Sequence, residues 1–245
     1  MLPPDWPLFV LAAYAAEIIG TMAGFGAATV LTPAASFFFD IKTAIAMVAV
    51  YHIFGNVARV LLFRQVRWRL FAQFSLASLA LTLLGAACVT WLPSSLVRLA
   101  FGAFLIVYTV ASLLNTSLTL LPTTRTAVVG GMSSGFLAGL LGTGGAVRAT
   151  FLTAFGLPRD AYLATSAMIA LLIDSTRLPV YLAQGFIGGE LLPLLVMLLA
   201  TAWLGALTGR RLVKQIPAAQ FRRFVFGMLF VMGIKLLWDG GAALR

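Results

Sequence analysis

Three polar side chains interrupt a long apolar stretch at residues 43–63. His52, Asn56 and Arg59 are spaced by four and then three residues, so they share one face of a helix. An arginine at the centre of a membrane helix costs about 2.5–3.5 kcal/mol, and such residues usually serve a function. This face is therefore a candidate anion site. The alternatives are that Arg59 reaches the membrane surface and that His52 is an ordinary packing residue.

A matching face lies in a second apolar stretch, residues 160–183, and comprises Ser166, Asp174 and Arg177. Asp174 and Arg177 are three residues apart, so they could form an ion pair within the helix or line an anion path. Acids at membrane depth often relay protons, and histidine can titrate near neutral pH. The candidates for proton coupling are Glu17, His52 and Asp174.

Glycine-rich breaks interrupt the apolar sequence at two places. The first contains Gly24, Phe25 and Gly26, and the second contains Gly142, Thr143, Gly144 and Gly145. A half-helix that starts after each break would aim unpaired N–H groups and its positive dipole end inward, which suits an anion. Close helix packing is the alternative reason for these glycines. Arg148, in the first turn after the second break, is a further candidate anion contact unless it extends to the surface.

The composition indicates which elements must position these residues. Of 245 residues, 61% are hydrophobic and 10% are charged, whereas a soluble domain has about 25% charged residues. Apolar segments cover residues 7–23, 26–39, 43–63, 70–91, 96–114, 127–141, 145–156, 160–183, 190–208 and 219–238. The sequence therefore predicts an all-α integral membrane protein.

The net charge of +10 could indicate nucleic-acid binding, which needs basic residues clustered on a solvated face. Here the basic residues lie mostly in short loops, where they set topology and contact anionic lipid headgroups. We expect the lipid bilayer and a small anionic substrate as partners, a possible homodimer, and no nucleic acid. One histidine and few deep acids make an intramembrane enzyme or a metal site a poor hypothesis, and no cofactor is expected.

The two halves of the sequence form an internal repeat with a shift of 118 positions. The aligned pairs include Gly24 with Gly142, Gly26 with Gly144, Asn56 with Asp174, and Arg59 with Arg177. Breaks at equivalent positions favour a binding site over simple packing. We predict transmembrane repeat 1 at residues 1–120 and transmembrane repeat 2 at residues 121–245.

Loop charge predicts that the repeats have opposite orientations. The loop after 43–63 carries three arginines, and the equivalent loop at 184–190 carries no Lys or Arg. The next loop shows the opposite bias, with Arg98 alone in repeat 1 and five basic residues between 210 and 223 in repeat 2. Because basic loops face the cytoplasm, equivalent loops should lie on opposite sides, as in many secondary transporters.

Inversion requires an odd number of crossings in each repeat. Five spans would satisfy this, as would a Gly-broken helical hairpin followed by three transmembrane helices. We favour the hairpin, because residues 26–39 and 145–156 are short for a span. Both arrangements place the two termini on the non-cytoplasmic side of the inner membrane.

The sequence resembles the TauE/SafE family of sulfite exporter-like anion transporters over nearly its whole length. The resemblance rests on the break in each half, on GLLGTGG at 139–145 and on LATSAMIALLIDSTRLPVYLAQG at 163–185. It implies transport of sulfite, organosulfonates or related anions. The site residues that it implies are Gly142, Thr143, Gly144, Gly145, Thr165, Ser166, Asp174 and Arg177.

We therefore expect an alternating-access carrier that moves a small anion across the cytoplasmic membrane, with export as the expected direction. The anion would bind between the repeats, at the two breaks and near Arg59, Arg177 and Arg148. A passive anion channel is the nearer alternative, and an intramembrane enzyme is the more distant one.

Overall fold

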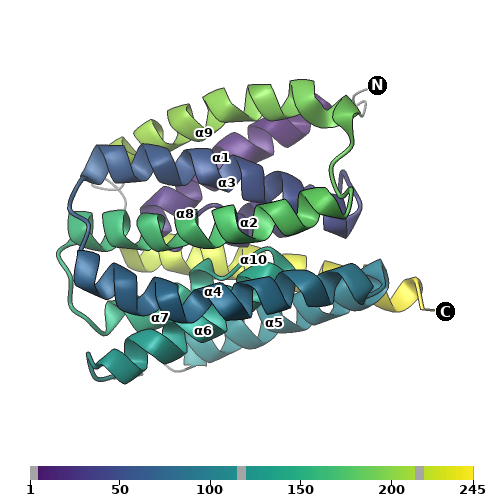
Figure 1. Cartoon of the computed structure of the whole chain (residues 1–245). Helices are drawn as coiled ribbons and strands as arrows, with labels where there is room; N and C mark the ends of the chain where they lie inside the picture. Colours follow the sequence, from purple (N-terminus) through teal and green to yellow (C-terminus); the bar gives the residue numbers. More distant parts are fainter. Residues whose placement is uncertain (1–4, 115–119, 213–217, 245) are drawn as a thin grey trace.

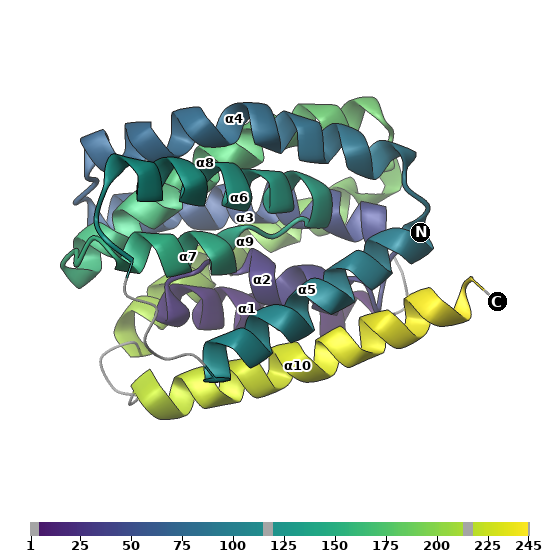
Figure 2. The same cartoon turned by 90° about the horizontal axis from the view of Figure 1, so that it is seen from below.

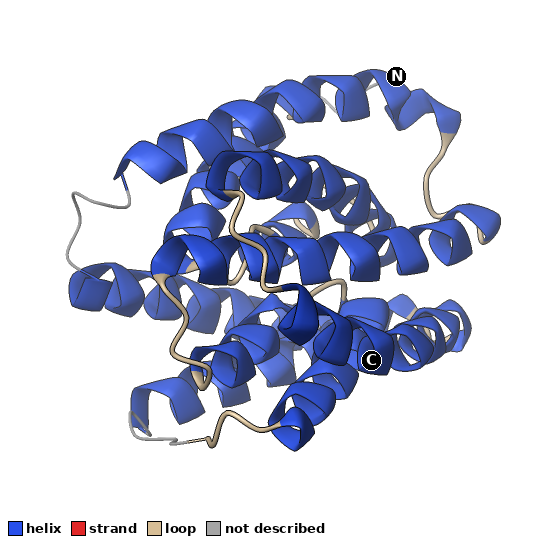
Figure 3. Cartoon of the chain, turned by 60° about the vertical axis from the view of Figure 1, so that its left-hand side comes forward, coloured by secondary structure: helices blue, strands red, loops and turns tan. Residues whose placement is uncertain are grey.

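The computed structural model describes residues 5–114, 120–212 and 218–244. All regular structure in this part of the chain is helical (Figure 3), which confirms the predicted all-α class. Seven of the helices are long and apolar enough to cross a membrane.

Each predicted apolar segment corresponds to one helix (Figure 1). In chain order they are α1 (Trp6–Ala23), α2 (Ala28–Ala35), α3 (Ile41–Phe63), α4 (Trp68–Trp91), α5 (Ser94–Leu114), α6 (Thr124–Leu141), α7 (Gly145–Thr153), α8 (Arg159–Ala183), α9 (Leu192–Leu212), which the 3-10 turn η1 (Gly189–Leu191) precedes, and α10 (Ala218–Ala242).

Helices α2 and α7 are much shorter than the others. They contain 8 and 9 residues, so they extend only about 12–14 Å at 1.5 Å per residue. A bilayer core is about 30 Å thick, so neither helix can cross it. The pairs α1–α2 and α6–α7 therefore fit the hairpin arrangement, and five full spans per half do not fit these lengths.

Each helix of the first half has a counterpart five places later in chain order, for example α6 for α1 and α9 for α4. Helices that pack on each other have counterparts that also pack on each other. Helix α1 packs on α9 as α6 packs on α4, and α3 packs on α9 as α8 packs on α4. Helices α3 and α8 pack on each other, and so do α5 and α10, which lie side by side in Figure 2. This pattern agrees with the alignment of the two halves in sequence.

The equivalent helices α3 and α8 run antiparallel. Near their centres, Asn56 Nδ2 donates to Asp174 Oδ2 at 3.3 Å. Just beyond the end of α3, the Arg67 N–H donates to the Thr165 hydroxyl, near the start of α8, at 2.9 Å. Later residues of α3 thus meet earlier residues of α8.

Equivalent loops consequently lie at opposite ends of the bundle. Arg210, in the last turn of α9, lies 5.7 Å from the ring of Phe63 at the end of α3. The start of α3 is at the other end, where Lys42 lies 5.6 Å from the ring of Phe186 in the loop after α8. The loop after α3 and the arginines at the end of α9, Arg210 and Arg211, therefore share one end, and both chain termini lie at the opposite end (Figure 1). Lys214 and Arg222 lie outside the residues whose side chains are described.

Glycines allow α6 to pack directly on α4. Gly131, Gly135 and Gly139 recur at every fourth residue of α6, and each lies against a backbone carbonyl of α4. Small residues at this spacing let helix backbones approach closely, which is how membrane helices gain packing energy without a hydrophobic driving force. A methyl group on Gly135 would lie 2.6 Å from the Ser78 carbonyl oxygen.

We expect Gly135→Ala to destabilise the protein in detergent. Overpacking of a close contact costs about 1–3 kcal/mol, which corresponds to a fall in Tm of roughly 2–10 °C for a chain of this size. Gly227→Ala is the matched control, because an added methyl group there meets no atom within 4 Å. Thermal unfolding of the two variants side by side is the measurement, and equal Tm values would contradict the packing role of Gly135.

Candidate functional site

Both glycine breaks end a helix in the same way. The first helix, α1, ends at Gly24 with φ 77°, and its N–H bonds to the Gly20 carbonyl at 3.0 Å. Helix α6 ends at Gly142 with φ 74°, and its N–H bonds to the Ala138 carbonyl at 3.0 Å. Glycine suits this left-handed conformation because it has no Cβ to clash. The two predicted breaks are therefore real and have the same local geometry.

The two breaks also meet inside the bundle. A side chain on Gly145 would overlap the carbonyl oxygen of Phe25. The hydroxyls of Thr29 and Thr143 lie 2.9 Å apart and are both buried. The starts of α2 and α7 therefore lie together, although 114 residues separate the two threonines in sequence.

Neither half-helix has a side-chain cap at its start. The N-cap residues are Ala27 for α2 and Gly144 for α7, and neither provides a capping hydrogen bond. The first N–H groups of a helix have no partner within the helix. Together with the positive end of the helix dipole, they favour negative charge.

Arg59 forms a buried ion pair with α1. Its Nε and Nη2 lie 3.0 and 2.5 Å from Oε1 of Glu17, and its Nη1 donates to the Asn56 side-chain oxygen at 2.7 Å. Glu17 is 0% and Arg59 is 3% exposed. The two charges therefore neutralise each other away from water, and Arg59 does not reach the membrane surface.

Arg177 is neutralised by a residue of its own helix. Its Nε and Nη2 lie 2.9 and 2.8 Å from Oδ1 of Asp174, and Nη1 donates to the Ala138 carbonyl at 2.6 Å. Asp174 occupies the place that Asn56 has in the other half. Each half thus contains one buried arginine and one buried acid, but the acid comes from a different position.

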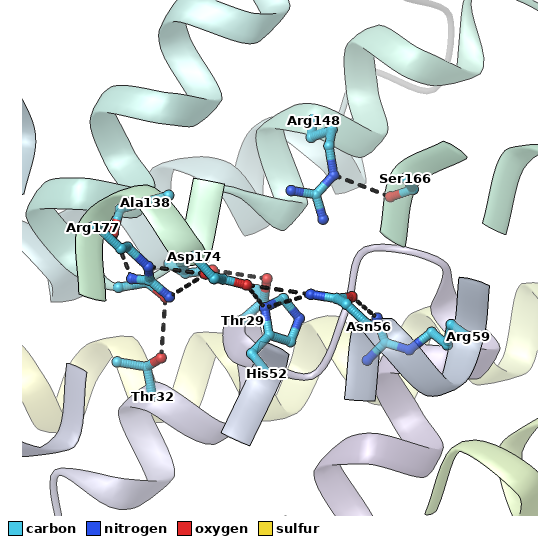
Figure 4. Close-up of polar contacts among 12 residues, drawn as sticks. Thr29, Thr32, His52, Asn56, Arg59, Ala138, Arg148, Ser166, Asp174 and Arg177 are labelled. Carbon is cyan, nitrogen blue, oxygen red and sulfur yellow. Dashed lines mark hydrogen bonds and ion pairs between the residues drawn. The ribbon is translucent and has the colours of Figure 1, made fainter. Parts of the chain in front are cut away.

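His52 joins the two halves at the centre of this network (Figure 4). Its Nδ1 lies 2.7 Å from Asp174 Oδ2, which also accepts from Asn56 Nδ2 at 3.3 Å. In the described parts of the chain, His52 Nε2 is buried and has no hydrogen-bond partner. In these same parts, no three His, Cys, Asp or Glu side chains are grouped to hold a metal ion.

Arg148 differs from the other two buried arginines. Its Nε donates to the Ser166 hydroxyl at 3.0 Å (Figure 4), and its Nη2 donates to the Phe25 carbonyl at 3.4 Å. Ser166 in turn donates to the Gly24 carbonyl at 3.3 Å. Arg148 is 2% exposed, and within the described residues it forms no ion pair with an acid. It is a buried cation whose polar partners are neutral.

One of the expected site residues lies outside this network. The Thr165 hydroxyl accepts from the Arg67 N–H and so holds the loop after α3. Gly144, within the second break, packs against the carbonyl of Ser134 on α6. The other expected residues lie at the two breaks or on the facing sides of α1, α3, α7 and α8.

Two threonines of α2 at the first break were not among the predicted site residues. Thr29 contacts Thr143, and Thr32 donates to the Gly142 carbonyl at 3.4 Å. Both are fully buried. Their spacing of three residues puts them on one side of the half-helix, and this pattern could have identified them.

We expect the Glu17–Arg59 pair to be strongly coupled. Removing one partner of a buried ion pair costs about 3–5 kcal/mol, because the other charge is left uncompensated. A chain of this size loses roughly 2–4 °C in Tm per kcal/mol. Glu17→Gln and Arg59→Gln should therefore each lower the Tm in detergent by more than about 5 °C. The double variant should lose less than the sum of the two losses, and strict additivity would contradict the pairing.

Comparison with known proteins agrees with this arrangement. The family model described as sulfite exporter TauE/SafE matches residues 8–236, which include both glycine breaks and the whole polar network. A search of curated proteins gave no match. The resemblance seen in the sequence is thereby confirmed, and this multi-pass membrane protein belongs to the sulfite exporter TauE/SafE family.

Proposed function

We propose that this chain is an alternating-access carrier for a small anion, which binds where the two glycine breaks meet. The observation that carries the proposal is Arg148, a buried arginine that has no acid partner among the described residues. An unpaired charge away from water costs several kcal/mol. A bound anion would remove this cost.

The charge balance of the described network supports an anion. Its buried cations are Arg59, Arg148 and Arg177, and its buried acids are Glu17 and Asp174. Two cations are matched by the acids, so one positive charge is left over while His52 is neutral. An anion near Arg148 would compensate this positive charge.

The local geometry supports the same position. The uncapped starts of α2 and α7 lie at the breaks, and Arg148 is in the first turn of α7. Helix starts of this kind bind anions through backbone N–H groups. Of the paired hydroxyls of Thr29 and Thr143, one O–H is left to donate to an oxygen atom of the ligand.

The roles of the three arginines differ in this proposal. Arg148 contacts the anion directly, because its guanidinium is not occupied by a carboxylate. Arg59 and Arg177 hold α1, α3, α6 and α8 in register around the site through their contacts with Glu17, Asp174 and the Ala138 carbonyl. Residue spacing alone does not distinguish Arg148 from the other two in this way, because it does not show which arginine lies beside a carboxylate.

We infer that the two halves are inverted repeats in the membrane. The antiparallel pairing of α3 with α8 and the exchange pattern of helix contacts support this orientation. Rocking one half against the other would then open the central site to each side in turn, as in other carriers with inverted repeats. Sulfite or an organosulfonate is the proposed substrate class, and export across the inner membrane is the proposed direction.

Flux of labelled sulfite into proteoliposomes tests the role of Arg148. We expect Arg148→Gln to lower the flux at low sulfite at least tenfold, because a hydrogen bond to a charged group contributes about 1.5–3 kcal/mol. Arg148→Lys should keep part of the flux, since it keeps the charge. Arg125→Gln is the control, because Arg125 is exposed at the start of α6.

The same assay separates the proposed carrier from a channel. A carrier gives saturable flux and exchange of internal for external sulfite, whereas large single-channel currents would indicate a channel. Flux in Arg148→Gln equal to that of the wild type would remove Arg148 from the site.

Reporter fusions test the proposed orientation. We expect both termini on the non-cytoplasmic side, because positively charged loops stay in the cytoplasm and the termini lie at the end of the bundle opposite to the loop after α3 and the arginines at the end of α9. Periplasmic alkaline phosphatase should be active when fused to the C-terminus and inactive when inserted in the loop at 64–67. The reverse pattern would contradict this orientation.

A further inference from the structure

Among the described residues, one ring nitrogen of His52 has a hydrogen-bond partner and the other has none. His52 lies at the middle of α3 and is 3% exposed. Its Nδ1 is 2.7 Å from Asp174 Oδ2. An ionised carboxylate can only accept hydrogen bonds, so Nδ1 carries a proton and donates it to Asp174. This bond fixes the orientation of the ring.

The Nε2 atom of His52 faces the first glycine break. In the described structure Nε2 has no hydrogen-bond partner. A Cβ placed on Gly26 would lie 2.5 Å from Nε2 and 3.5 Å from Nη1 of Arg59. Nε2 is therefore directed at the break backbone, where the proposed anion site lies.

The charge around Nε2 depends on its protonation. The charged groups around His52 are Asp174 from α8, Glu17 from α1 and Arg59 from its own helix. Glu17 is paired with Arg59, and Asp174 is paired with Arg177. The charges within the Glu17–Arg59 pair and within the Asp174–Arg177 pair cancel, so Arg148 leaves a net charge of +1 in the buried network. A neutral Nε2 presents a lone pair that repels an anion, whereas a protonated Nε2 donates a hydrogen bond to it.

We propose that His52 is the proton-binding residue that couples anion movement to a proton. The imidazole takes up one proton at Nε2 when the anion enters the site, and it returns that proton to water on the side where the anion leaves. This inference rests on the anion site proposed above. Because the protonated form binds the anion, affinity must fall as the pH rises.

The chain offers a direct readout, since His52 is its only histidine. Protein labelled with ¹⁵N-histidine and purified without a histidine tag gives a single imidazole in NMR spectra. Methanesulfonate is the probe, because it has no proton that titrates near neutral pH. At pH 8 without the anion we expect the neutral ring with the proton on Nδ1. Saturating methanesulfonate should convert the ring to the doubly protonated form at the same pH.

Controls separate coupling from binding. Arg148→Gln, which lacks the proposed anion contact, should leave the imidazole neutral at the same methanesulfonate concentration. Binding is followed independently by the thermal shift that the anion produces. If wild-type protein binds methanesulfonate and its imidazole stays neutral, the coupling role is wrong and the anion site stands. If neither methanesulfonate nor sulfite binds or moves, the anion site fails, and the coupling role fails with it.

Transport gives a second test. Wild-type proteoliposomes should take up protons with methanesulfonate, seen with a trapped pH dye, and the apparent KM should rise by up to about tenfold per pH unit above neutral pH. His52→Gln should exchange methanesulfonate without proton movement and with a flat pH profile. Proton movement with sulfite but not with methanesulfonate would show that the substrate carries the proton, and it would overturn the role of His52.

Discussion

The need to balance charge away from water organises the interior of this protein. A charged side chain inside a bilayer is tolerated when another charge or several polar groups compensate for it. Glu17 compensates Arg59, and Asp174 compensates Arg177. Each pair also ties helices together, because Arg59 joins α3 to α1 and Arg177 joins α8 to α6 through the Ala138 carbonyl. The helices around the centre are therefore positioned by the same contacts that make the charges tolerable.

The two halves meet this requirement with different residues. The second half of the chain places the acid on the same helix as the arginine, whereas the first half has Asn56 at that position and takes its acid from α1. The glycines Gly55 and Gly205 give Glu17 the room it needs, since added methyl groups would lie 2.6 Å from its carboxylate and its Cβ respectively. This asymmetry leaves Asn56 and His52 of the first half free to contact Asp174 of the second half. The central contact between the halves is consequently formed by unlike residues.

The glycine breaks bring backbone and charge to one place. An irregular backbone at membrane depth is tolerated only inside protein or against a water-filled cavity, and here the breaks pack on each other and on α3 and α8. Their meeting depends on the antiparallel pairing of α3 and α8, which sets each break against the first half of the opposite long helix. Gly24 lies against Leu163, and Gly142 lies against Ile45, the residue equivalent to Leu163. Arg148 belongs to α7 of the second half, so the unpaired positive charge lies on the α7 side of the two breaks.

Periodicity, composition and internal alignment were sufficient to predict ten helical segments, their short half-helices, both breaks and the polar face that contains His52, Asn56 and Arg59. These features follow from local rules, because apolar length and helical spacing are properties of neighbouring residues. The spacing of Asp174 and Arg177 offered their ion pair as one alternative, but the partner of Arg59 could not be predicted, because Glu17 and Arg59 are separated by 42 positions and meet only when α1 packs beside α3. Only the tertiary structure therefore decided that Arg59 is paired with Glu17 and that Arg148 has no acid partner among the described residues, since these contacts depend on distances between helices that the sequence does not contain.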